Sequence, residues 1–271
     1  MNNLPKGGSE AMTQPSMLLG GTDPASKQCP VAFHAVIEAA PPTPGQRLLR
    51  VSEVARDYPR SSPLASVLDW MHAFLARTHP ELGRKGAVCP FVPLSLEQDS
   101  IWMAEIGDGN ATVESISAVI RQYRDLFLVT EPISGPDTIN KAFVVVFPNL
   151  GPDGAGVVDQ VQSLLKKDFV EMGLMLGEFH ASNQSPGLRN AEFRPLRSPI
   201  PMLAIRHMVD SDLPFLLRYV YAPAERSSFL RSYLFRLAGT LGQVRFDQAL
   251  DGVIEAEIQK WIAAADEVQA R

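Results

Sequence analysis

The sequence is short of the residues on which several classes of protein depend. Its 271 residues include only two cysteines, Cys29 and Cys89. The pair matches neither the close spacing of a zinc site nor the several bridges of a small secreted domain. We therefore expect a reducing, cytoplasmic setting and a fold held by an apolar core, which a chain of this length can bury without disulfides.

Positive charge and long apolar runs are also scarce. The net charge is -5 at pH 7 and no large cluster of Lys and Arg stands out, so nucleic acid is not expected as a partner. No apolar run approaches the roughly 20 residues that span a bilayer, and the N-terminus lacks the basic and apolar segments of a secretory signal. The sequence therefore predicts no membrane partner either.

Composition changes along the chain and indicates how it is organised. Residues 1–27 are rich in Gly, Ser, Pro and Thr and contain no aromatic residue, so they bury too little surface to offset the entropy of ordering. The whole chain is 45% hydrophobic and 20% charged, which is typical of a globular protein. We predict a disordered tail over 1–27 and a single catalytic domain over 28–271.

Apolar periodicity predicts an alternation of helices and strands. Helical spacing covers 61–78, 112–123 and 157–172, and two more helices follow at about 223–239 and 246–267. Runs of β-branched and aromatic residues predict strands at 101–106, 126–129, 142–147, 174–180 and 201–208, and a short one within 213–219. The predicted fold is a single α/β (α+β) domain with a central mixed sheet flanked by helices and a helical C-terminal end.

One histidine stands where an apolar run gives way to a turn-rich segment. The run ends at His180, and Arg189, Arg194 and Arg197 follow closely. A histidine so placed can present one ring nitrogen to a metal, a haem iron or a proton while a hydrogen bond holds the other. Guanidinium groups bind carboxylates in a two-pronged geometry. The alternative is that His180 is a hydrogen-bonded structural residue and the arginines are surface charge.

A second candidate group is the thiol of Cys89, at the end of a loop punctuated by Gly and Pro. Arg84 and Lys85 precede it, and positive charge can lower the pKa of a thiol enough to make it a nucleophile. The alternative is a small packing residue. No serine-hydrolase elbow, phosphate loop, zinc-protease helix or dinucleotide fingerprint is present.

Three blocks of the sequence together resemble a known family. They are Val88-Cys89-Pro90-Phe91, residues 177–180 with Arg189, and residues 197–206. The blocks resemble a bacterial family that is catalogued as a domain of unknown function and found near biosynthetic genes. Its layout is similar to that of the YqcI/YcgG type, which includes the haem protein of D-cycloserine biosynthesis. The resemblance covers residues 60 to 220 or so.

The resemblance implies a haem enzyme. His180 would be the axial ligand of the iron of haem b, and Arg189 would bind a haem propionate. Arg206 and His207 would be the reserve propionate partner and reserve ligand, and Arg194 and Arg197 would complete the cofactor site. The implied reaction is oxidation at nitrogen of a small amino-acid-derived substrate, such as a guanidine or hydroxyguanidine, by dioxygen or peroxide.

Two other functions are open on the residues alone. In the first, Cys89 and His180 act as nucleophile and base of a cofactor-free enzyme. In the second, the protein binds without catalysis, and its C-terminal helices form a dimer face. We expect the protein to be a homodimer.

Overall fold

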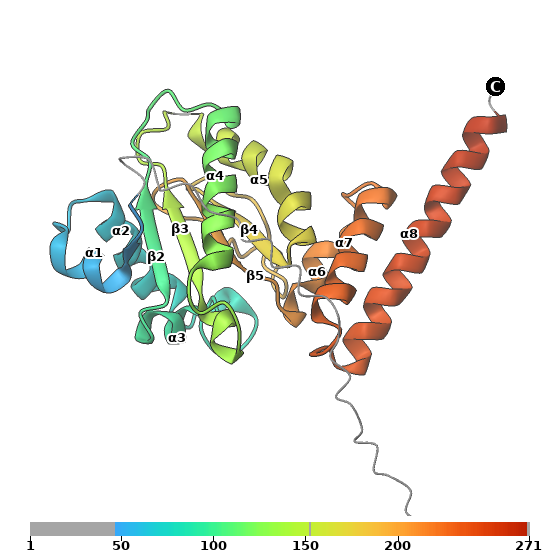
Figure 1. The fold of residues 1–271 in the computed structure, drawn as a ribbon, viewed down its shortest axis with the longest axis horizontal. Coiled ribbons are helices and arrows are strands. Elements are labelled where there is room, and N and C mark those ends of the chain that lie inside the picture. The colour runs from blue at the N-terminus through green and yellow to red at the C-terminus, as the bar shows by residue number, and fades with distance from the viewer. Residues whose placement is uncertain (1–46, 152, 270–271) are drawn as a thin grey trace, which may run out of the picture. The chain divides into compact units, whose positions relative to one another are not determined.

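Figure 1 shows the computed structural model, which describes residues 47–151 and 153–269. The tail predicted at 1–27 and the start of the predicted 28–271 domain lie outside these residues. The described residues belong to one compact unit. None of the helices in these stretches combines the length and apolar character needed to cross a bilayer.

The described strands form one mixed sheet in the order β1-β2-β3-β5-β4. They are β1 (Leu49–Arg50), β2 (Ile101–Glu105), β3 (Ala142–Val146), β4 (Leu174–Phe179) and β5 (Met202–His207). β2 and β3 are parallel, and β5 runs antiparallel to both β3 and β4. β4 is therefore parallel to β2 and β3, so these three strands end at the same edge of the sheet, where His180 follows β4.

Helices cover both faces of the sheet. On one face lie α4 (Val113–Val129), which links β2 to β3, and α5 (Gly154–Glu171), which links β3 to β4. On the other lie α1 (Val51–Asp57), α2 (Pro63–Trp70) and the π-helical turn η1 (Met71–Leu75). Successive strand residues point to opposite faces, so Leu203 and Ile205 pack against α4 and α5 while Met202 packs under α2.

The remaining elements are short, except for a C-terminal pair of helices. They are η2 (Pro80–Leu82), α3 (Val92–Glu97), η3 (Pro136–Asn140), η4 (Asp210–Asp212), α6 (Leu213–Leu216), α7 (Pro223–Leu237) and α8 (Gln243–Gln269). α7 packs between α5 and α8, in a separate core that includes Val170, Phe229 and Leu230. The predicted α/β class, with its mixed sheet and helical C-terminal end, is confirmed.

Local signals in the sequence account for several helix ends. Ser62 caps α2 by accepting a hydrogen bond from the backbone N–H of Ala65, and Pro63 fits the first turn because it needs no N–H partner there. α5 is followed by Gly173, whose φ of 76° lies in the left-handed region that glycine adopts without strain.

Two predicted strands are wrong. Residues 126–129 form the last turn of α4, because Phe127 continues the helical spacing of Ile116, Ile120 and Tyr123 and is fully buried with them. The predicted strand within 213–219 is replaced by α6, where Pro214 occupies the first turn. Proline lacks the N–H that a strand ladder needs, whereas a first helical turn leaves that group unused.

Candidate functional site at the end of β4

A polar pocket of about 610 Å³ lies where β4 ends beside the first turns of α5. The residues around it come from α5, β4 and the segment that follows β4. They are Ala155, Gly156, Asp159, Gln162, Glu178, His180, Ser182, Asn183, Gln184 and Ser185. Two carboxylates and a histidine face this space, and none of the described residues that line it is a lysine or arginine.

Glycine at the start of α5 permits the close packing that forms this corner. A Cβ atom on Gly154 would lie 2.6 Å from the Cβ of Leu150, in the turn that follows β3. A larger residue would push the first turn of α5 away from Leu150. The close approach brings Asp159, on the second turn of α5, opposite the end of β4.

His180 is held by hydrogen bonds at both ring nitrogens. Its Nε2 lies 3.0 Å from Oδ1 of Asp159 and its Nδ1 lies 3.1 Å from Oγ of Ser182, and the residue is only 4% exposed. A carboxylate can only accept, so the bond to Asp159 places the proton on Nε2 and leaves the Nδ1 lone pair facing the Ser182 hydroxyl. Asp159 thus selects the tautomer in which Nδ1 is the basic nitrogen.

Glu178 supplies the second carboxylate of the pocket. Burial is the main cause that raises its pKa above the ordinary value, and the nearby charge of Asp159 raises it further. Its position on β4 is unusual, because the residues two and four positions earlier, Leu176 and Leu174, are buried against α5. A carboxylate in an otherwise apolar row of a strand is the sequence signal that could have found this residue.

The sequence reasoning also missed Asp159. An acidic residue in an amphipathic helix looks like any solvated side chain, and half of the Asp159 side chain is indeed exposed. Only the packing of α5 against β4 gives it a histidine partner.

Arg197 lies behind the pocket wall. Its Nε donates to the backbone oxygen of Asn183 at 3.2 Å, and its Nη2 donates to Oε1 of Gln184 at 3.3 Å. The backbone oxygen of His180 accepts a further hydrogen bond from the N–H of Ser198. The segment containing Arg197 therefore positions the wall and leaves no guanidinium in the pocket.

The other predicted arginines are dispersed. Arg189 is exposed, and its Cβ packs against Gly83. Arg194 donates to the backbone oxygens of Ala191 and Phe193. Arg206 donates two hydrogen bonds to the carboxylate of Asp212, at 2.7 and 2.5 Å. The structure does not bring these side chains together around His180.

Cys89 and His180 lie on opposite faces of the sheet. Cys89 packs in the core under α2, and its backbone N–H donates to the oxygen of Leu75. Its thiol lies near Arg206, at the end of β5 that pairs with the start of β4. His180 instead contacts α5 on the other face, beyond the last residue of β4. In this structure the two residues do not share a pocket.

His207, the reserve ligand, also lies away from the pocket. Its ring is 5.0 Å from that of Phe127, and its Nε2 is buried without a hydrogen-bond partner. Lys141 lies beside it, with Nζ donating to the backbone oxygens of Phe127 and Thr130 at the end of α4. Burial, and secondarily the charge of Lys141, lower the pKa of His207 to about 4.

This environment predicts a dependence of stability on pH. Between pH 4 and 6.5 the unfolded chain binds a proton at His207 that the folded chain does not bind. The free energy of unfolding therefore has its full value above pH 6.5 and decreases as the pH drops toward 4. The loss should be about 2 to 3 kcal/mol. Urea unfolding at pH 4.5 and 7 should show a smaller difference for His207→Leu than for wild type. An unchanged difference would contradict this account, and exposed His72→Leu is the control.

The residues around His180 do not fit a haem as they stand. Axial ligation needs a free nitrogen lone pair, whereas both ring nitrogens have partners. A porphyrin also needs a broad apolar slot, whereas the wall of this pocket is mostly polar. Within the described residues, no group of three or more His, Cys, Asp or Glu side chains could hold a metal ion.

The comparison with family models assigns most of the described fold to one family. The model described as "Domain of unknown function (DUF6875)" matches residues 64–243, more than half of the chain. The chain belongs to the DUF6875 family. No curated protein and no solved structure gives a significant match. The DUF6875 region runs from α2 to the first residue of α8, so it contains every residue of the pocket, and nearly all of α8 lies beyond it.

Proposed function

We propose that the pocket at the end of β4 is an active site in which His180 transfers a proton to or from a small nitrogen-containing substrate. The observation that carries the proposal is the Asp159–His180 pair, with one ring nitrogen 3.0 Å from a carboxylate and the other facing the pocket wall at Ser182. The pair lies at the carboxyl edge of parallel strands, where α/β proteins commonly place their sites.

We infer a role for each group from its position. Nδ1 of His180 accepts a proton, and Asp159 stabilises the imidazolium that forms and keeps the ring oriented. The exposed Ser182 hydroxyl is hydrogen-bonded to Nδ1, so it can relay a proton between the ring and a molecule in the pocket. Arg197 is a positioning residue, because it holds the backbone of Asn183.

The charges of the pocket indicate the class of substrate. Asp159 and Glu178 face the space without a lysine or arginine in the lining, which favours a cation such as an amine or guanidine. A cation near both carboxylates would also relieve their mutual repulsion, which contributes to the raised pKa of Glu178. The amides of Gln162, Asn183 and Gln184 add hydrogen-bonding partners.

Ligand binding tests this preference. We expect agmatine and L-arginine amide to raise the melting temperature at millimolar concentration, and inorganic phosphate to have no such effect. Glu178→Gln should weaken agmatine binding by about tenfold, the effect of losing 1.4 kcal/mol. Asp168→Asn, on α5 but outside the pocket, is the matched control. Phosphate binding more tightly than agmatine, or an unaffected Glu178→Gln, would refute the cation site.

A second candidate function rests on the resemblance to the YqcI/YcgG type. It is a haem-dependent oxygenase that oxidises a nitrogen of an amino-acid-derived substrate, and it requires His180 to exchange one of its two ring hydrogen bonds for a bond to the iron. Absorbance spectra of wild type and His180→Ala, expressed with a haem precursor, separate the candidates. A Soret band near about 400 nm that depends on His180 would favour the oxygenase. A wild type that stays colourless with added haem would favour the acid–base site.

A further inference from the structure

α8 contacts the rest of the described chain along one side only. The start of α7 lies beside residues 255–259 of α8, through hydrogen bonds from Arg226 to Gln259 and from Ser227 to Glu257. α8 continues from there to Gln269, past the first residue of α7, as Figure 1 shows. Among the described residues, no helix therefore lies beside the last turns of α8.

Small residues form the side of α8 that faces α7. Ala249 and Ala256 are fully buried, and Gly252 lies between them. A Cβ atom on Gly252 would lie 2.6 Å from a methyl carbon of Leu217 and 2.8 Å from one of Leu230. This side of α8 is closely packed, and larger side chains would not fit there.

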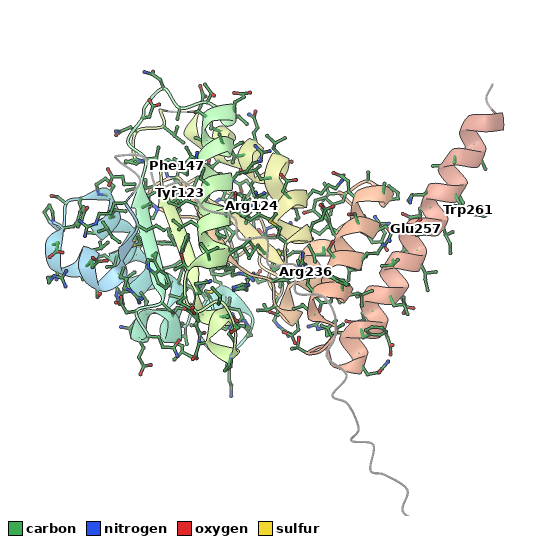
Figure 2. The ribbon with its side chains drawn as sticks, in the orientation of Figure 1. Tyr123, Arg124, Phe147, Arg236, Glu257 and Trp261 are labelled. Atoms are coloured by element: carbon green, nitrogen blue, oxygen red, sulfur yellow. The ribbon has the colours of Figure 1, made fainter. Side chains whose placement is uncertain are left out.

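The large apolar residues of α8 lie mostly on the other side and are exposed. Leu250, Ile254, Ile258 and Trp261 follow one another at spacings of four, four and three, which keeps them on one side of a helix. Figure 2 labels Trp261 on the side of α8 that is turned away from α7. Together with Val244, Phe246 and Ile262, these side chains are between 37% and 80% exposed.

This surface, which we call the α8 stripe, is large for a monomer. From their exposed fractions, its seven residues expose on the order of 800 Å² in total, whereas the largest apolar patch of a typical monomer is about 300 to 600 Å². A standard interface buries about 800 Å² on each partner. One copy of the α8 stripe therefore supplies the area that each half of a stable dimer needs.

We propose that the α8 stripe binds the α8 stripe of a second copy of this chain, with the two helices antiparallel. A surface that pairs with itself across a two-fold axis closes a dimer and leaves no stripe exposed. The dimer contact does not include the pocket at His180, whose residues come from α5, β4 and the segment after β4.

The distribution of charge along α8 favours the antiparallel arrangement. Asp247 and Asp251 lie in its first half, while residues 258–265 contain Lys260 and no acidic residue. Parallel helices would place like acidic residues beside each other, which is destabilising. Antiparallel helices place Asp247 and Asp251 of one copy beside residues 258–265 of the other, which contain no acidic residue, and the small alanines at 263–265 leave room for Phe246.

Light scattering of the full-length protein tests the dimer. We expect wild type at about 50 µM to have twice the mass of one chain. Ile258→Asp should raise the dimer dissociation constant at least about 30-fold, as for the loss of a central interface residue. The matched control is Leu164→Asp, because Leu164 on α5 is 56% exposed and Ile258 is 54% exposed. Circular dichroism checks that both variants fold.

Cysteine cross-linking tests the orientation in a Cys29→Ser, Cys89→Ser background. A mixture of Leu250→Cys and Ile262→Cys proteins should form a disulfide-linked pair under oxidation, whereas neither protein alone should link to itself efficiently. Self-linking of each single variant would show a parallel pair and overturn the proposed arrangement. A monomeric wild type at 50 µM, or an Ile258→Asp protein that dimerises like wild type, would overturn the dimer itself.

Discussion

Replacing His180 with glutamine is expected to lower kcat/KM for the substrate of the pocket by about 10²- to 10⁴-fold, the contribution of a positioned general acid or base. Glutamine retains hydrogen-bonding groups near Asp159 and Ser182 but cannot exchange a proton near neutral pH. Asp159→Asn should also lower the rate, because an amide that donates to Nε2 would move the ring proton to Nδ1 and remove the base. The pH profile of kcat/KM should lose its histidine limb in His180→Gln.

The matched control for this prediction is His72→Gln. His72 is exposed in η1, on the other side of the sheet from the pocket, and should retain the wild-type rate. Melting temperatures of all three variants separate a loss of chemistry from a loss of folded protein. A His180→Gln enzyme with a wild-type rate and pH profile would remove His180 from the mechanism and leave it a structural residue.

Replacing Arg206 with leucine should destabilise the fold by about 3 to 5 kcal/mol, because it leaves a buried carboxylate without its partner. Asp212 is 1% exposed and accepts two hydrogen bonds from Arg206 and one from the backbone N–H of Val209. The substitution would remove the positive charge of Arg206 and both of its hydrogen bonds to Asp212. Urea denaturation of wild type and variant measures the difference in the free energy of unfolding.

Arg189→Leu provides the comparison for Arg206. Arg189 is exposed, and its removal should change the free energy of unfolding by no more than about 0.5 kcal/mol. The resemblance assigned both arginines to a cofactor, so the pair of variants also tests that assignment. If Arg206→Leu were as stable as Arg189→Leu and lost only ligand binding, the structural role would be wrong and the cofactor role would gain support.

The sequence predicted those helices and strands whose signals lie within a few neighbouring residues. The cap at Ser62, Gly173 after α5 and the continuous apolar run of β3 each depend on neighbours a few residues away, and the structure confirms the corresponding helices and strand. The wrong strand predictions arise because the same local signals can be overridden by packing. Residues 126–129 are as apolar as the residues of a buried strand. They nevertheless belong to the helix that Thr112 caps, because Phe127 is buried on the same side of that helix as Ile120.

The candidate site was predictable only in part. His180 stood out because it ends an apolar run, and the structure places it at a pocket wall. Its partner Asp159 lies 21 positions earlier on a different element, so no spacing in the sequence marks the pair. Conversely, Cys89 and His180 look alike as reactive groups in the sequence, but the fold packs the loop that contains Cys89 under α2 and places His180 beside α5, on opposite faces of the sheet.

By itself, then, the sequence determined the fold class and most element positions, and it singled out one residue of the pocket wall, because hydrophobic periodicity and caps act over one or two turns. Only the tertiary structure decided which groups meet. The order of the strands brings α5 beside the end of β4, so that Asp159 forms a hydrogen bond with His180. The tertiary structure also pairs Arg206 with Asp212 and places Arg197 against the backbone of the pocket wall. Those contacts depend on how elements distant in the chain pack, which residue types and local spacing do not encode.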